Sequence, residues 1–138
     1  MSRRPLKIAA LVLALGPAPA AAQTSSPAQS VWDSAYTAEQ AAGGEAAFRL
    51  SCSNCHALAQ FAGPSFLGAW EGGSAYELFQ LVSEQMPFDN PGSLPRPQYL
   101  AVLAYMFKLN GFPAGSRPLP GEPQELKQIR ILAKPEPK

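Results

Sequence analysis

The first clear pattern along the chain is a stretch of helix-forming residues that begins at Thr37. Threonine is a good N-cap, and Gln40 stands three positions later, where a glutamine completes a capping box. Alanines and Phe48 follow, and alanine is the strongest helix former. Gly43 and Gly44 interrupt this stretch, and each costs about 1 kcal/mol relative to alanine in a helix interior. We therefore expect another backbone to approach closely here; the alternative is simply a weak helix.

Two further helices are predicted downstream. In one, Ser74 is the N-cap and Glu77 its capping-box partner, and apolar residues follow at positions i, i+3, i+4 and i+7. This helix should end at Gln85, because Pro87 pushes the residue before it out of the α region. The other helix spans about 97–110 and is apolar on most sides, so it should be largely buried. No segment alternates as a strand would, and the sequence predicts a small all-α fold with three main helices and long loops.

The two ends of the chain differ from this helical centre. Residues 1–22 combine a basic start, a short apolar run and small residues up to Ala22, the pattern of a signal peptide cleaved near that alanine. The apolar run is far short of the ~20 residues that span a bilayer, so no stable membrane span is expected. We expect a flexible segment over 23–35, one domain over 36–115 and a proline-rich tail over 116–138. The apolar residues able to hold this tail on the core are Leu126, Ile129, Ile131 and Leu132.

The charge balance argues against one class of partner. Once the basic signal residues are removed, eight Lys and Arg face ten Asp and Glu. Nucleic-acid-binding proteins carry a basic patch or a high isoelectric point, and this chain has neither. No nucleic-acid partner is therefore expected.

The reactive side chains concentrate in one five-residue window. The chain's two cysteines and its single histidine are Cys52, Cys55 and His56, in a Cys-x-x-Cys-His arrangement. This is the attachment sequence of a c-type haem, in which both thiols bond to the porphyrin edge and the histidine supplies an axial nitrogen to iron. A redox dithiol would need a βαβ context, structural zinc would need a fourth ligand, and a plain disulfide would leave the histidine unexplained. We therefore predict one covalently attached haem c.

The second axial ligand of the iron is predicted to be Met86. Met1 belongs to the signal, and Met106 lies mid-helix among apolar neighbours, where methionine is usually core filler. Met86 follows a helix directly and is held extended by Pro87, which limits the entropy cost of keeping it on the metal. Ligation by His56 and Met86 leaves no open site and raises the reduction potential, which suits electron transfer. An iron site for catalysis or gas sensing would follow if Met86 did not bind.

Two more residues are candidate haem contacts. An axial histidine normally donates its other N–H to an acceptor, and the Pro64 carbonyl is the candidate; the alternative is a plain Gly-Pro turn. The indole N–H of Trp70 is a candidate donor to a haem propionate. Five large apolar residues are predicted to line the haem site: Trp70, Phe66, Phe79, Leu81 and Phe88. The alternative is that they pack in the core without contact to the haem.

In their order along the chain, the Cys-x-x-Cys-His motif, Gly63-Pro64-x-x-Leu67-Gly68 and Met86-Pro87 resemble a class I cytochrome c. The resemblance covers about 36–115 and implies a small fold in which helices and loops wrap one haem. It also implies that the first and last helices cross at Gly44, with aromatic residues around the crossing. These aromatic residues would be Phe48 and one of Tyr99, Tyr105 and Phe107.

A narrower resemblance rests on the residues of 86–94 and 99–115. Their sequence is similar to that of cytochrome domains and subunits that serve periplasmic quinoprotein dehydrogenases. This similarity implies a periplasmic one-electron carrier that is not itself an enzyme. It would accept electrons from a dehydrogenase and pass them to an oxidase or another cytochrome. The alternative is a dedicated haem subunit, held by the tail to one dehydrogenase. The general secretory route is favoured over twin-arginine export, because haem should be attached to an open chain after export.

Overall fold

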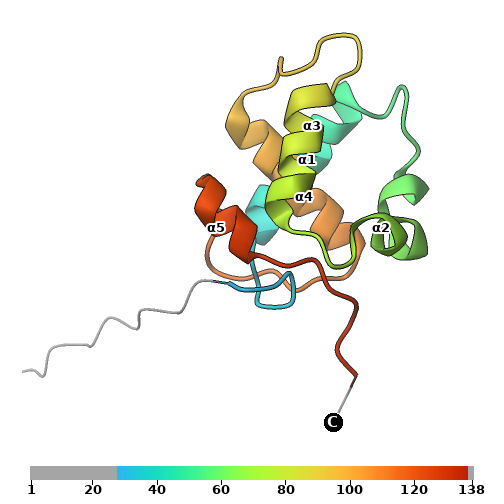
Figure 1. The fold of residues 1–138 in the computed structure, drawn as a ribbon. Coiled ribbons are helices and arrows are strands. Elements are labelled where there is room, and N and C mark those ends of the chain that lie inside the picture. The colour runs from blue at the N-terminus through green and yellow to red at the C-terminus, as the bar shows by residue number, and fades with distance from the viewer. Residues whose placement is uncertain (1–27, 137–138) are drawn as a thin grey trace, which may run out of the picture.

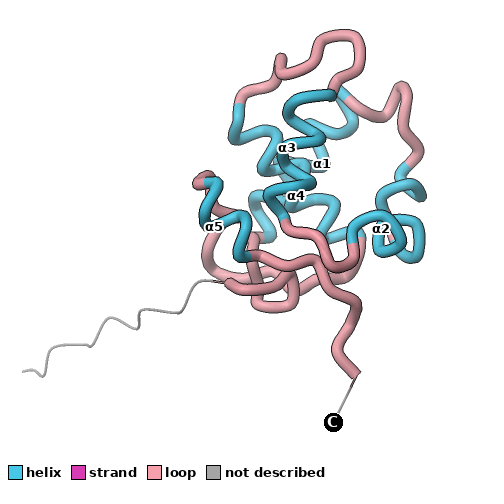
Figure 2. The backbone as a smooth tube through the Cα atoms, in the orientation of Figure 1, coloured by secondary structure: helices cyan, strands magenta, loops and turns pink. Residues whose placement is uncertain are grey.

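Five α-helices and one short 3-10 helix form the regular structure of residues 28–136, the part of the chain that this computed structural model describes (Figure 1). Within these residues there is no strand, only isolated β-bridges (Figure 2), so the all-α prediction is confirmed. The predicted signal peptide over 1–22 lies outside the described residues. The elements are α1 (Ala38–Ser51), η1 (Leu58–Phe61), α2 (Gly63–Trp70), α3 (Ala75–Gln85), α4 (Arg96–Leu109) and α5 (Pro123–Gln128).

The helix starts follow the capping residues of the sequence. Thr37 caps α1, where its hydroxyl oxygen accepts from the backbone N–H of Gln40 at 3.1 Å. The reciprocal half of that capping box is absent, because the Gln40 amide oxygen instead accepts from the N–H of Leu119 at 2.7 Å. Ser74 and Glu77 form the full capping box of α3, as predicted. The side chain of Gln40 therefore bonds to the distant backbone of Leu119 instead of the nearby backbone of Thr37, whereas Glu77 keeps its local partner.

Helices α1 and α4 cross at Gly44. A β-carbon added there would collide with the carbonyl of Ala101 and would lie 3.0 Å from the β-carbon of Tyr105. The predicted close approach of a second backbone is therefore confirmed. Gly43, its neighbour, has nothing within 4 Å of the same added atom. Beside the crossing, the rings of Phe48 and Tyr105 lie with their centroids 5.8 Å apart.

Two helices were not predicted. A plain turn was the alternative interpretation of Gly63-Pro64, but Pro64 stands in the first turn of α2, where its missing N–H costs nothing. The short helix α5 begins with Pro123 inside the proline-rich tail in the same way. Both helices are too short for an apolar repeat to reveal them. The three predicted main helices are present as α1, α3 and α4, and the short helices α2 and α5 bring the number of α-helices within residues 28–136 to five.

The two described ends of the chain pair with each other. The N–H of Val31 donates to the Arg130 carbonyl at 2.9 Å, and the N–H of Arg130 donates to the Gln29 carbonyl at 2.9 Å. Val31 is fully buried and Ala35 is 4% exposed, so these residues of the segment expected to be flexible pack on the core. Leu126, Ile129 and Ile131 of the tail are buried as expected, whereas Leu132 is 41% exposed.

The loops that follow α1 and α3 lie at one end of the molecule, and the two described ends of the chain lie at the other (Figure 1). The loops that follow α1 and α3 lie at the top of Figure 1, while residues 28–36 and the end of the tail lie at the bottom. No helix among residues 28–136 is long and apolar enough to cross a membrane.

Candidate functional site

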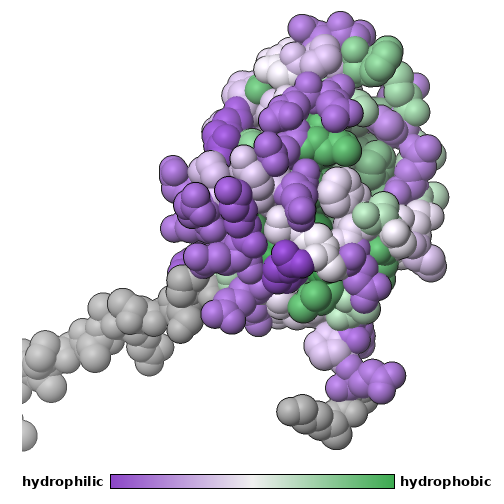
Figure 3. Space-filling view, viewed as in Figure 1, coloured by the Kyte–Doolittle hydropathy of each residue, from purple (hydrophilic) through white to green (hydrophobic). Residues whose placement is uncertain are grey.

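A cavity of about 570 Å³ brings the predicted ligands together. Cys52, Cys55 and His56 line it from the segment after α1, and Met86 lines it from the end of α3. Hydrophobic residues are visible at the upper right of the face shown in Figure 3, among hydrophilic ones, at the end that holds these loops in Figure 1. The remaining lining residues are mostly apolar: Phe48, Leu50, Ser51, Asn54, Phe61, Leu81, Val82, Pro87, Phe88, Asp89, Asn90, Ser93, Leu94, Val102 and Met106.

The end of α1 positions the cysteine motif. Cys52 is the C-cap of the helix, and its N–H donates to the Phe48 carbonyl at 2.8 Å. The Cys52 carbonyl then accepts from the N–H groups of Cys55 at 3.1 Å and His56 at 3.0 Å. These bonds fold the motif into a tight turn on the helix end. Both cysteines are free thiols.

The two thiols differ in their surroundings. Cys52 is half-buried, and desolvation by burial raises the pKa of its thiol. Cys55 is exposed at the surface. Cys52 is therefore held as the neutral thiol at neutral pH, whereas Cys55 is open to reagents from solvent.

The imidazole of His56 is oriented by Gln60. Its Nδ1 lies 3.2 Å from the side-chain Oε1 of Gln60, and the same oxygen accepts from the Ala57 N–H at 3.2 Å. The ring also packs edge-on against Phe61, with centroids 5.2 Å apart. Pro64, the acceptor expected from the sequence, is exposed in the first turn of α2, and its role stays a prediction. Sequence reasoning missed Gln60, because His56 lies outside any helix and no regular spacing relates the two residues.

Asn110 fixes the segment that follows the motif. Its side-chain nitrogen donates to the Phe61 carbonyl at 2.9 Å and to the Met106 carbonyl at 2.8 Å. Its side-chain oxygen accepts from the Gly63 N–H at 2.8 Å. One side chain thus joins the end of α4 to the residues on both sides of Ala62. Sequence reasoning assigned Asn110 only to a helix end.

Met86 is the C-cap of α3 and has the extended backbone expected from the proline after it, with φ −123° and ψ 151°. Its N–H donates to the Val82 carbonyl at 3.1 Å. Its carbonyl accepts from the Tyr99 hydroxyl at 2.7 Å. The Met86–Pro87 peptide bond is cis. Backbone contacts therefore hold Met86 on the wall of the cavity.

Only some of the expected wall residues line this cavity. Leu81 and Phe88 do so, whereas Phe66 and Phe79 are buried in the helical core, 1% and 5% exposed. Trp70, at the end of α2, packs against the core outside the lining, and its contact with a propionate stays a prediction. Four of the lining residues that were not predicted come from α1, η1 and α4. The apolar positions of these helices do not reveal which side faces a cavity: Phe48, Phe61, Val102 and Met106.

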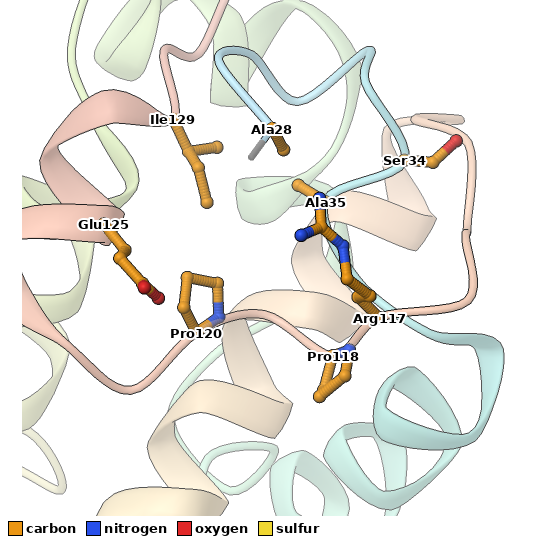
Figure 4. Close-up of a pocket in the computed structure, with 8 residues that line it drawn as sticks. All are labelled: Ala28, Ser34, Ala35, Arg117, Pro118, Pro120, Glu125 and Ile129. Carbon is orange, nitrogen blue, oxygen red and sulfur yellow. The ribbon is translucent and has the colours of Figure 1, made fainter. Parts of the chain in front are cut away.

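A second cavity of about 320 Å³ lies between the described N-terminal residues and the tail (Figure 4). Arg117 and Glu125 are its charged lining residues, and they come from different parts of the tail. It contains none of the side chains expected to bind haem. The other lining residues are Ala28, Ser34, Ala35, Pro118, Pro120 and Ile129.

The donor set of the larger cavity fits a covalently bound haem. Two thiols are available for the porphyrin edge, an imidazole and a thioether for the iron, and apolar side chains for the macrocycle. Among residues 28–136, no group of three or more His, Cys, Asp and Glu side chains is placed to hold a metal ion directly. Comparisons with protein-family models, curated proteins and solved structures found no match.

Proposed function

We propose that this protein is a monohaem c-type cytochrome, of the class I fold, that carries single electrons. The observation that carries the proposal is the cavity whose wall contains both the Cys-x-x-Cys-His motif and Met86. The motif follows α1 and Met86 follows α3, yet they meet at one apolar space. The crossing of α1 and α4 at Gly44 further supports a class I cytochrome c, by resemblance.

Each residue has a distinct role in this proposal. Cys52 and Cys55 would hold the haem through thioether bonds, while His56 would supply a nitrogen and Met86 a sulfur to its iron. A haem bound here would supply a one-electron couple between ferric and ferrous iron. Gln60 accepts from His56 Nδ1, which leaves the other ring nitrogen for the metal. The apolar wall disfavours additional charge, and Met86 favours the reduced state, so both raise the reduction potential.

The proposed setting is the periplasm, with a dehydrogenase as electron donor and an oxidase or another cytochrome as acceptor. The haem-attachment motif and the basic-apolar N-terminus of the sequence support this setting. Two large apolar side chains of the lining, Leu50 and Phe88, are 82% and 86% exposed. An apolar surface of this kind suits the small, transient contacts of redox partners, which bury less than ~1,200 Å².

The packing of the tail favours a free carrier over a permanent subunit. Leu126, Ile129 and Ile131 are each at most 2% exposed, because they are buried against the protein's own core. Leu132 alone among the expected aliphatic anchors remains substantially exposed. The tail therefore has few apolar side chains left with which to hold a dehydrogenase.

The optical spectrum of the haem-loaded protein tests the proposal. Wild type should show the weak long-wavelength sulfur-to-iron charge-transfer band of the ferric form, and Met86→Leu should abolish it. Met106→Leu is the matched control, because Met106 is also a lining methionine and leucine is close to methionine in volume. If wild type lacks the band and its reduced form binds carbon monoxide at once, the iron site is open and the carrier function is wrong.

A further inference from the structure

One side chain closes the loop that carries Met86. The Tyr99 hydroxyl donates to the Met86 carbonyl at 2.7 Å and accepts from the Leu94 N–H at 3.2 Å. These bonds join the two ends of the loop over 86–94. The Gly92 N–H adds a longer bond to the same Met86 carbonyl at 3.4 Å. Both Met86 and Leu94 line the large cavity, so the loop forms part of its wall.

Tyr99 is itself firmly placed. It lies near the start of α4 and is only 3% exposed. Helix α4 makes its tightest contact with α1, the helix that ends at the cysteine motif. The hydroxyl therefore fastens the Met86 loop to the same helix pair that positions Cys52.

We propose that Tyr99 is the positioning residue of the sixth iron ligand. It acts through Met86, by holding the backbone of that residue at a fixed place on the cavity wall. This inference rests on the proposed function, because it requires that Met86 binds the iron. A thioether is a weak ligand, so its occupancy depends on how little freedom the loop must lose on binding.

Loss of the hydroxyl would free the loop and weaken the methionine against competing ligands. An added ligand can bind only to the fraction of molecules in which Met86 has left the iron. The smaller this fraction is, the lower the apparent affinity of the added ligand. In Tyr99→Phe, one carbonyl and one amide lose their shared partner, and the loop gains freedom. We expect imidazole to bind the ferric protein about tenfold more tightly, the factor that corresponds to the net worth of one to two hydrogen bonds.

Tyr36→Phe is the matched control. The Tyr36 hydroxyl donates to the Phe112 carbonyl at 2.7 Å, and Tyr36 is 2% exposed, so it matches Tyr99 in distance and burial. Neither Tyr36 nor Phe112 lines the large cavity. Phenylalanine keeps the ring in both variants, so each is expected to fold with a comparable loss of stability. Tyr36→Phe should leave the imidazole affinity within about twofold of wild type.

The experiment titrates haem-loaded ferric wild type, Tyr99→Phe and Tyr36→Phe with imidazole. Imidazole binding is followed by the main haem absorption band, which is present with or without Met86, and the charge-transfer band reports separately whether Met86 binds the iron. The same titration in a Met86→Leu background completes a double-mutant cycle. There Tyr99→Phe should have no effect, because the residue through which it acts is gone. Equal affinities for the two tyrosine variants, or an undiminished effect in the Met86→Leu background, would overturn the inference while Met86 ligation stands. A wild type without the band, which binds imidazole as tightly as Met86→Leu does, would overturn the proposed function and the inference together.

Discussion

The backbone of Gly44 in α1 lies against the carbonyl of Ala101 in α4, with no room between them for a β-carbon. Two helices that are far apart in sequence thus touch through their main chains. Because α1 ends at Cys52 and the first turn of α4 contains Tyr99, this contact fixes two sides of the large cavity. Its loss would therefore disturb both the stability of the fold and the placement of the ligands.

Gly44→Ala should destabilise the protein by about 3 kcal/mol or more, because the added methyl must push two main chains apart. Urea unfolding of the haem-loaded protein, followed by circular dichroism, measures this change. Gly43→Ala is the control at the next position, where the added atom meets nothing within 4 Å. It should stabilise the protein by about 0.8–1 kcal/mol through helix propensity. Similar effects of the two substitutions would show that the helices do not cross at Gly44.

Gln60 should tune the reduction potential through His56. In Gln60→Leu the imidazole loses its acceptor and becomes a weaker donor to iron, so the potential should rise by about 40 mV, equivalent to one hydrogen bond. In Gln60→Glu the acceptor is charged and stronger, so the potential should fall. Protein-film voltammetry of the three haem-loaded proteins measures both shifts. Unchanged potentials in both variants would mean that another acceptor, such as the Pro64 carbonyl, takes the Nδ1 proton.

The tail should contribute to the stability of the domain. Leu126→Ala removes a fully buried side chain and should cost about 2–5 kcal/mol in the free energy of unfolding. Leu132→Ala, at a residue that is 41% exposed, should cost about 0.5 kcal/mol or less. Thermal unfolding of both variants provides the comparison. Equal melting temperatures would show that the tail does not pack on the core in solution.

Acid should selectively weaken the start of α3. Hydrogen bonds from the Ser74 backbone N–H and hydroxyl hold the pKa of Glu77 below its ordinary value of 4.5. A carboxylate whose pKa is lower in the folded state contributes stability at neutral pH, and this contribution is lost as the pH falls below about 4.5 and through the lowered value. Wild type should therefore exceed Glu77→Gln in stability at pH 7, and the difference should shrink towards pH 3. Unfolding curves at several pH values test this, and a constant difference would contradict it.

Local signals in the sequence were enough to predict the main helix starts. Thr37 and Ser74 cap their helices because the bonds they make lie within one turn. Gln40 shows where such reasoning stops, since its capping partner was local but its actual partner is the backbone of Leu119. The position of that backbone depends on how the tail packs, and no nearby residue indicates it.

The candidate site divides in the same way. Cys52, Cys55 and His56 are recognisable because the proposed haem attachment would require them at fixed spacing, and Met86 because the proline after it shapes its backbone. Tyr99 and Asn110 act through hydrogen bonds to backbone groups of distant segments, which leave no pattern in the sequence. Trp70 and Phe79 were expected at the cavity because they are large and apolar. Only the packing of the helices decides which apolar side chains fill the core and which face a cavity.

Both described ends of the chain lie at the opposite end of the molecule from the loops that carry the proposed iron ligands (Figure 1). Residues 132–136 at the end of the tail are exposed. A molecule attached to a solid support through this end would therefore present its cavity to the solution. In a film prepared in this way every molecule would have the same orientation, and a soluble partner would meet the same face each time.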